Sequence, residues 1–456
     1  MLGRVDVTRR VPNTMLRELL AETDWTGDAL ARAVNMTGAE AGMSLRYGRS
    51  SVAHWLAGMC PRPPVPELVA EVFSRKLGRP VTIGDTGLVG AAMAAPRTAW
   101  WEMNVPSQLT APREVGAGGS ALLASHGYRM AELAVPSWEE LSRTRRGRTW
   151  TASTVEKVER WHVRSAAAMV GLFSDADFAF GGGRVRLNLS SYLAATMSPW
   201  LRASATPTVR HDLLVTTARL TYLCGFMYFD DDLHGAAQHY YLTNLRLVAE
   251  AGDATAYAVT LRALSSQARL LGHHREAVQL AETAVRAAAN TAGQQTLAFL
   301  FGQLAVAHAS DGNRHDAVRH LLTAERHLER AREAPEPIGG CHTASLAHQQ
   351  AAVRAQLGDR RGAVQALALS VRHRPAGERR SRAITLARLA ELQLDDGDLE
   401  AACGTWRWFL QDYPHLKSRR VTRALTAMRA RLRPHQNAAA VTALRQRMAC
   451  RLAEQH

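Results

Sequence analysis

Apolar residues recur at intervals of three and four along about the first eighty positions and predict four short helices, each with one buried face. Thr26 carries the hydroxyl that favours a helix start, and Gly58 stands where the third helix is expected to end. Pro64 and Pro66 suit the first turn of the fourth helix, because proline lacks the N–H that this turn leaves unbonded. The expected inward positions are Leu16, Leu19, Leu20, Leu30, Ala33, Val34, Val52, Trp55, Leu56, Leu68, Val69, Val72 and Leu77.

The third of these helices, within residues 47–58, is polar on its outer side. Small residues and hydrogen-bond donors occupy that side, as expected where side chains approach phosphates and base edges. Either Ser50 or Ser51 is expected to cap its first turn. Four short helices with a polar third one predict a helix-turn-helix DNA-binding domain over residues 10–88. The alternative is an all-helical core whose third helix happens to be polar outside.

The candidate DNA-binding residues lie on this helix and on both sides of it. We expect Arg49 and His54 to face bases or phosphates, and Ser51 to cap the helix and touch phosphate. Arg46 either contacts phosphate or belongs to a solvated loop. The full candidate set is Arg46, Arg49, Ser50, Ser51, His54 and Arg62.

The connection before the third helix, residues 35–48, is longer than the three or four residues of a usual helix-turn-helix. Either the second helix continues through residues 39–41, or a loop containing Gly38 and Gly42 intervenes.

From about residue 209 the chain repeats a helical hairpin whose polar turn is followed by an alanine. Five such turns occur, and their alanines are 41, 40, 46 and 38 residues apart. Self-similarity at this period predicts an α-solenoid similar to tetratricopeptide repeats, over residues 151–440. The alternative is a plain helical bundle. The turns are residues 230–236, 271–277, 311–317, 357–363 and 396–401.

Between the two halves, residues 89–150 are rich in proline and glycine and are expected to form a linker. Trp100 and Trp101 are too apolar for a wholly free tether, so part of the linker is expected to dock on a domain. A helix with Val155, Val158 and Trp161 is expected to follow from Ser153.

Several segments together resemble the actinomycete regulators of the NsdA type, over about residues 10–435. Members pair an Xre-like helix-turn-helix with tetratricopeptide-like repeats, and their role is similar to that of negative regulators of differentiation and antibiotic production. The resemblance implies a cytoplasmic transcription regulator with Arg49, Ser50, Ser51 and His54 facing DNA. Ala53 replaces a serine that related Xre helices often have. The segments that carry the resemblance are Pro12–Thr14, Ser51–Gly58 with Pro61–Pro64, Val158–His162, Asp175–Gly183, and Tyr240–Tyr241 followed by Leu245.

Size and composition agree with a multidomain globular protein, since 456 residues exceed what a single core usually holds. The formal charge of +15 weakly favours a polyanionic partner, and the excess lies mainly in Arg143–Arg148 and in the run from Lys417 to Arg433. That run is expected to be a solvated face, with a second contact to the DNA backbone as the alternative. Five scattered cysteines, no signal sequence and no membrane-length apolar run predict a cytoplasmic location.

Catalytic motifs are absent from the sequence, so we expect neither an enzyme nor a cofactor or metal site. The run 181–183 has three glycines but lacks the lysine and hydroxyl of a phosphate-binding loop, and is expected to stop a helix. Asp230, Asp231 and Asp232 are expected to cap a helix instead of binding metal.

These features together predict a sequence-specific transcription regulator, more plausibly a repressor than an activator, that binds double-stranded DNA. We expect a homodimer held through the repeats, because useful specificity usually requires two half-sites. The alternative function is a scaffold whose repeat groove holds a peptide or protein and which has little affinity for DNA. In a third scheme, a ligand in the groove releases the DNA.

Overall fold

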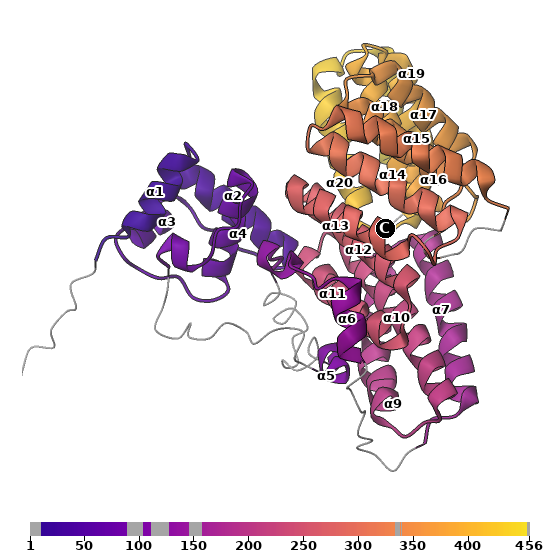
Figure 1. The fold of residues 1–456 in the computed structure, drawn as a ribbon. Coiled ribbons are helices and arrows are strands. Elements are labelled where there is room, and N and C mark those ends of the chain that lie inside the picture. Colours follow the sequence, from indigo (N-terminus) through magenta and orange to yellow (C-terminus); the bar gives the residue numbers. More distant parts are fainter. Residues whose placement is uncertain are drawn as a thin grey trace, which may run out of the picture.

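A computed structural model of the chain describes residues 11–88, 104–110, 127–145, 157–332, 338 and 340–453. Every regular element in these ranges is a helix, apart from a single bridge between Lys157 and Ser204. The expected all-helical class is therefore confirmed. Figure 1 shows a small group of helices, α1–α4, beside a larger stack of helical hairpins.

The small group has its own apolar core. Buried side chains of all four helices meet there, among them Leu16, Leu30, Val52, Trp55 and Phe73. The helices begin and end close to the positions that the apolar pattern predicts. They are α1 (Thr14–Glu22), α2 (Gly27–Glu40), α3 (Arg49–Leu56) and α4 (Val65–Leu77).

Two segments between 104 and 145 pack on the larger stack. The helix α5 (Val105–Thr110) buries Val105 and Leu109, and the carbonyl of Gln108 lies 2.9 Å from Nε2 of His239. The helix α6 (Trp138–Arg145) follows Pro136, whose carbonyl accepts a hydrogen bond from the hydroxyl of Tyr257 at 2.6 Å. Parts of the region expected to be a linker thus pack against the repeats. Trp100 and Trp101 lie outside the described residues.

The first long helix of the larger stack begins at Arg160, seven residues after the expected start at Ser153. Val158 precedes the helix, because its N–H donates to the carbonyl of Ser204 at 2.8 Å and Glu159 is extended. The helix α7 (Arg160–Phe180) ends at Gly181, which has φ +81° and stops it as expected. The short helices α8 (Arg186–Tyr192) and α9 (Ser198–Arg202) follow, joined by a π-helical turn.

Five helical hairpins make up the body of the stack, and the five predicted turns separate their helices. Four of these turns contain a glycine with φ between +85° and +90°, whereas the first uses Asp232 at φ +56°. The alanine expected at each helix crossing is buried in the first four hairpins; in the fifth, Ala402 is buried in place of Ala401.

The hairpins are α10 (Pro207–Asp230) with α11 (His234–Ala251), α12 (Ala254–Leu270) with α13 (His274–Ala288), α14 (Gln294–Ser310) with α15 (Arg314–Arg330), α16 (Thr343–Gln356) with α17 (Arg360–Arg372), and α18 (Arg379–Asp395) with α19 (Leu399–Asp412). They are followed by α20 (Arg419–Leu432) and α21 (Ala439–Ala453).

The beginning and the end of the stack are joined. The N–H of Lys417 donates to the carbonyl of Phe180 at 2.7 Å, and the carbonyl of Lys417 accepts from the N–H of Gly183 at 3.0 Å. Arg380 of α18 forms an ion pair with Asp177 of α7 at 2.5 Å. A Cβ at Gly183 would lie 2.8 Å from the Lys417 carbonyl oxygen, so the glycine permits this approach. We call the joined stack the closed repeat coil.

Candidate functional site

The helix α3 turns its apolar residues inward and leaves its polar face exposed. Val52 and Trp55 are 0% and 3% exposed, whereas Arg49, Ser50 and His54 are exposed to solvent. Trp55 packs edge-on against the ring of Tyr47, with centroids 5.2 Å apart. The first residue of α2, Gly27, lies close to α3, since a Cβ there would be 3.4 Å from Cγ1 of Val52.

The start of α3 differs from the prediction. Gly48 is the N-cap, so Ser50 and Ser51 both lie inside the helix and neither caps it. The hydroxyl of Ser51 instead accepts a long hydrogen bond of 3.5 Å from the N–H of Gly48. The serine cap was wrong because the extended backbone of Gly48 starts the helix two residues earlier than Ser50. Ser51 is half-buried, and its hydroxyl is engaged by the backbone of Gly48.

The long connection before α3 is an ordered part of the core. The helix α2 continues to Glu40 and is followed by Gly42 at φ +77°, so the first of the two sequence alternatives holds. The amide of Asn35 then makes two hydrogen bonds to the backbone of Tyr47, each of 2.9 Å. Leu45 fills the space that the missing side chain of Gly38 leaves. These contacts fix the direction in which the chain enters α3.

Charged side chains around α3 are not neutralised within the described part of the chain. Arg46, Arg49 and Arg62 are exposed, and none of them forms an ion pair with a described residue. Arg17 on α1, which the sequence analysis did not single out, is likewise exposed and unpaired. Three other arginines of the α1–α4 group do have carboxylate partners: Arg32 with Asp28, Arg75 with Glu40 and Glu71, and Arg79 with Glu22.

The α1–α4 group touches the closed repeat coil through α2 and α4. Glu71 of α4 lies 2.8 Å from Nε2 of His273 and accepts the N–H of Met130 at 3.3 Å. Arg75 donates to both Glu71, at 2.8 Å, and Glu40, at 2.7 Å. Burial raises the pKa of Glu40, although Arg75 opposes this shift. Figure 1 shows α4 nearer the hairpins than α1 and α3, so the polar face of α3 is left free.

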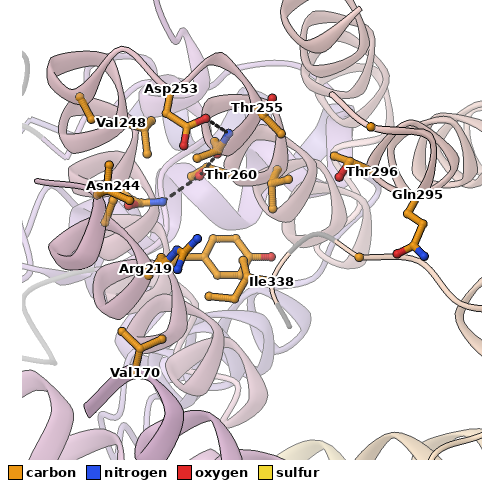
Figure 2. Close-up of a pocket in the computed structure, with 18 residues that line it drawn as sticks. Val170, Arg219, Asn244, Val248, Asp253, Thr255, Thr260, Gln295, Thr296 and Ile338 are labelled. Atoms are coloured by element: carbon orange, nitrogen blue, oxygen red, sulfur yellow. Dashed lines mark hydrogen bonds between the residues drawn. The ribbon is translucent and has the colours of Figure 1, made fainter. Parts of the chain in front are cut away.

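A cavity of about 330 Å³ lies among α10, α11, α12 and the turn before α14 (Figure 2). Its polar groups largely bond to one another: Asn244 donates to the hydroxyl of Thr260 at 2.8 Å, and Asp253 accepts the N–H of Ala256 at 2.8 Å. Arg219 adds a cationic side chain to this lining. The sequence analysis did not find this cavity, because three consecutive helices enclose it together with the separate segments at 293–296 and 338–340.

The aspartates of the first hairpin turn bind arginines. Asp230 lies 3.7 Å from Arg380, and Asp232 lies 3.3 Å from Arg423. No group of three or more His, Cys, Asp or Glu side chains suited to a metal occurs among the described residues. Likewise, none of the described helices combines the length and the apolar character needed to cross a membrane.

Comparison with known protein families gives a match in the N-terminal part of the chain. Residues 16–89 match the family model described as the SP15 N-terminal domain. This segment contains α1–α4 almost entirely and has nearly the bounds of the first predicted domain. No curated protein matches the chain.

Proposed function

We propose that the chain is a sequence-specific DNA-binding transcription regulator, with α3 as the helix that enters the major groove. The observation that carries the proposal is the solvent-exposed polar face of α3, whose Arg49 has no ion-pair partner among the described residues and which is held in place by buried Val52 and Trp55. An exposed helix of this kind fits the major groove of B-DNA, where base edges present hydrogen-bonding groups. The resemblance to NsdA-type regulators favours repression of differentiation or secondary metabolism.

The proposed roles follow from the positions of the side chains. Arg49 and His54, on the outer face of α3, supply donors to base edges or phosphates, and Ser50 adds a hydroxyl. Arg46 and Arg62 come before and after α3 in the chain and are proposed to contact phosphates on either side. Ser51 has a lesser role, because its hydroxyl bonds to Gly48.

One copy of α3 has only eight residues and makes few contacts. We therefore propose a homodimer that places two copies of α3 on half-sites about one helical turn of DNA apart. A scaffold that binds a peptide or protein in the closed repeat coil is the second candidate function, and the cavity in Figure 2 favours it.

Chromatin immunoprecipitation followed by footprinting of the purified full chain tests the proposal. We expect a protected sequence of two half-sites, and we expect Arg49→Ala and His54→Ala to abolish the footprint without changing the helical circular dichroism. Arg32→Ala is the matched control, because Arg32 is exposed but already paired with Asp28. Unchanged footprints in both α3 variants would remove these residues from the proposal, and the absence of any preferred sequence would favour the scaffold.

A further inference from the structure

A second cavity, of about 280 Å³, lies inside the closed repeat coil. The first helix of each hairpin contributes to its wall, namely α10, α12, α14, α16 and α18, and α20 adds Arg420. Six helices spread over more than two hundred residues therefore face one small space.

The lining of this cavity is strongly cationic. It contains five arginines and no aspartate or glutamate. Two of the arginines are neutralised by residues outside the lining: Arg380 by Asp177 at 2.5 Å, and Arg374 by Glu378 at 2.8 Å. The other three are Arg262, Arg269 and Arg420. None of these three has a carboxylate within ion-pair distance in the described part of the chain.

Two of the three unpaired arginines pack against aromatic rings, and all three carry an electrostatic penalty. The guanidinium of Arg262 lies 3.9 Å from the ring centroid of Phe299, and that of Arg420 lies 5.1 Å from that of Phe229. Burial lowers the pKa of all three arginines, and for Arg269 the charges of Arg420 and Arg262 lower it further. Nearby like charges withdrawn from water destabilise the empty protein.

Some buried hydrogen-bonding atoms of the cavity residues also lack a partner. The buried Nε atoms of Arg262 and Arg269 have no partner, nor does the Oε1 of Gln349. Burial lowers the pKa of His348 to about 3, so its ring is neutral and adds no charge. Asp230 and Asp232 partly offset the charge of Arg420 from farther away. A site that holds three cations and free N–H donors, with no carboxylate at ion-pair distance among the described residues, matches a ligand that supplies the negative charge.

We propose that this cavity binds a small organic anion with at least two negative charges, a phosphate ester or a polycarboxylate, through Arg262, Arg269 and Arg420. The guanidinium fork matches the paired oxygens of both groups. The volume of about 280 Å³ favours a small molecule over a peptide or protein chain. This inference does not depend on DNA binding, because the cavity is inside the coil and α3 is in the separate α1–α4 group.

Thermal unfolding of the full chain without DNA tests the inference. Inorganic pyrophosphate and citrate are the two probes, each compared with sodium chloride at the same ionic strength. We expect at least one probe to raise the unfolding midpoint by about 2 °C or more at saturating concentration. A response to pyrophosphate alone indicates a phosphate ester, and a response to citrate alone indicates a polycarboxylate. A glutamate-rich peptide is tested as a third additive. A midpoint that depends on ionic strength only, or that rises with this peptide but with neither probe, would overturn the proposal.

Variants distinguish a binding role from a structural one. Arg262→Gln and Arg420→Gln are expected to abolish the anion-induced rise and to leave the midpoint of the empty protein unchanged or higher, because each removes an uncompensated charge. Arg361→Gln is the charge-matched control, since Arg361 is exposed on α17. If either of the two cavity variants does not fold, Arg269→Gln is measured in its place. Anion responses equal to that of the unmodified protein in these variants would show that the cavity is not the binding site.

Discussion

The salt dependence of DNA binding offers a quantitative test of the two arginines that flank α3. Arg46 and Arg62 are exposed and have no ion-pair partner among the described residues, so each is free to contact one phosphate. Each phosphate contact contributes about 0.9 to the slope of log affinity against log salt concentration. Changing both arginines to alanine should therefore reduce the slope by about 1.8 per subunit, or about 3.6 for two subunits on one site.

This difference is large enough to measure. Between about 50 and 200 mM salt, a slope smaller by about 3.6 means that the variant loses roughly 150-fold less affinity than the unmodified protein does. Fluorescence anisotropy of a labelled duplex that carries the footprinted site, titrated at several potassium chloride concentrations, gives both slopes. The variant should keep its preference for the site, because phosphate contacts position the protein and base contacts specify the sequence.

The matched control is the double variant Arg32→Ala and Arg79→Ala. It removes the same net charge from the α1–α4 group, but Asp28 and Glu22 already engage these two guanidiniums. We expect its slope to equal that of the unmodified protein. If the Arg46 and Arg62 variant keeps the full slope, or if the control lowers the slope equally, the two flanking arginines do not contact phosphate and net charge alone governs binding.

Three further predictions concern stability. Trp55→Ala should destabilise the α1–α4 group by about 3–5 kcal/mol in chemical denaturation, because the indole is only 3% exposed; a loss below about 1 kcal/mol would contradict its core role. Gly182→Ala should lower the free energy of unfolding by about 1–3 kcal/mol, since its Cβ would lie 2.7 Å from Cα of Met227. By contrast, Gly171→Ala in α7 should raise it by about 0.5–1 kcal/mol, because a Cβ there meets nothing within 4 Å. Burial lowers the pKa of His234 from 6.5 to about 3, and the nearby charges of Arg75, Arg423 and Arg420 act in the same direction. Below pH 6.5 the unfolded chain therefore protonates this histidine while the folded protein keeps it neutral. The free energy of unfolding should fall as the pH decreases below 6.5. The free energy of unfolding should fall by at most about 1.4 kcal/mol per pH unit through this one group, and His234→Gln should reduce the dependence. Identical pH dependences of the free energy of unfolding for the variant and the unmodified protein would show that His234 is not responsible.

Local signals predicted the helices well. Thr26 accepts the N–H of Ala29 at the start of α2, and Gly58 adopts φ +92° after α3, as the sequence indicates. The sequence predicted the hairpin turns equally well, because each turn needs a residue that tolerates positive φ followed by a small residue at the helix crossing. The serine cap of α3 and the helix at Val158 were wrong. In both cases the backbone of a neighbouring residue, Gly48 or Glu159, sets the helix start.

Features that depend on distant segments were not predictable. Arg420 belongs to the run that the sequence analysis expected to be a solvated face, yet it lines the inner cavity. Arg262 and Arg269 resemble ordinary surface arginines until α12 is placed opposite α16 and α20. Glu71 offers no local signal either, since its contact with His273 joins positions 202 residues apart. Periodicity specifies which face of a helix is apolar, but it does not specify which distant helix covers that face.

The join between Phe180 and Lys417 limits how the protein responds to a partner. An open superhelix of repeats can change its pitch to fit a longer ligand, whereas contacts between its first and last helices restrict that change. An extended chain longer than the interior would first have to break the two backbone hydrogen bonds at Lys417. Truncation just before that residue would remove these two hydrogen bonds and leave the ion pair of Arg380 with Asp177 as a remaining link between the two ends. The hairpins should then become more flexible while each keeps its own fold.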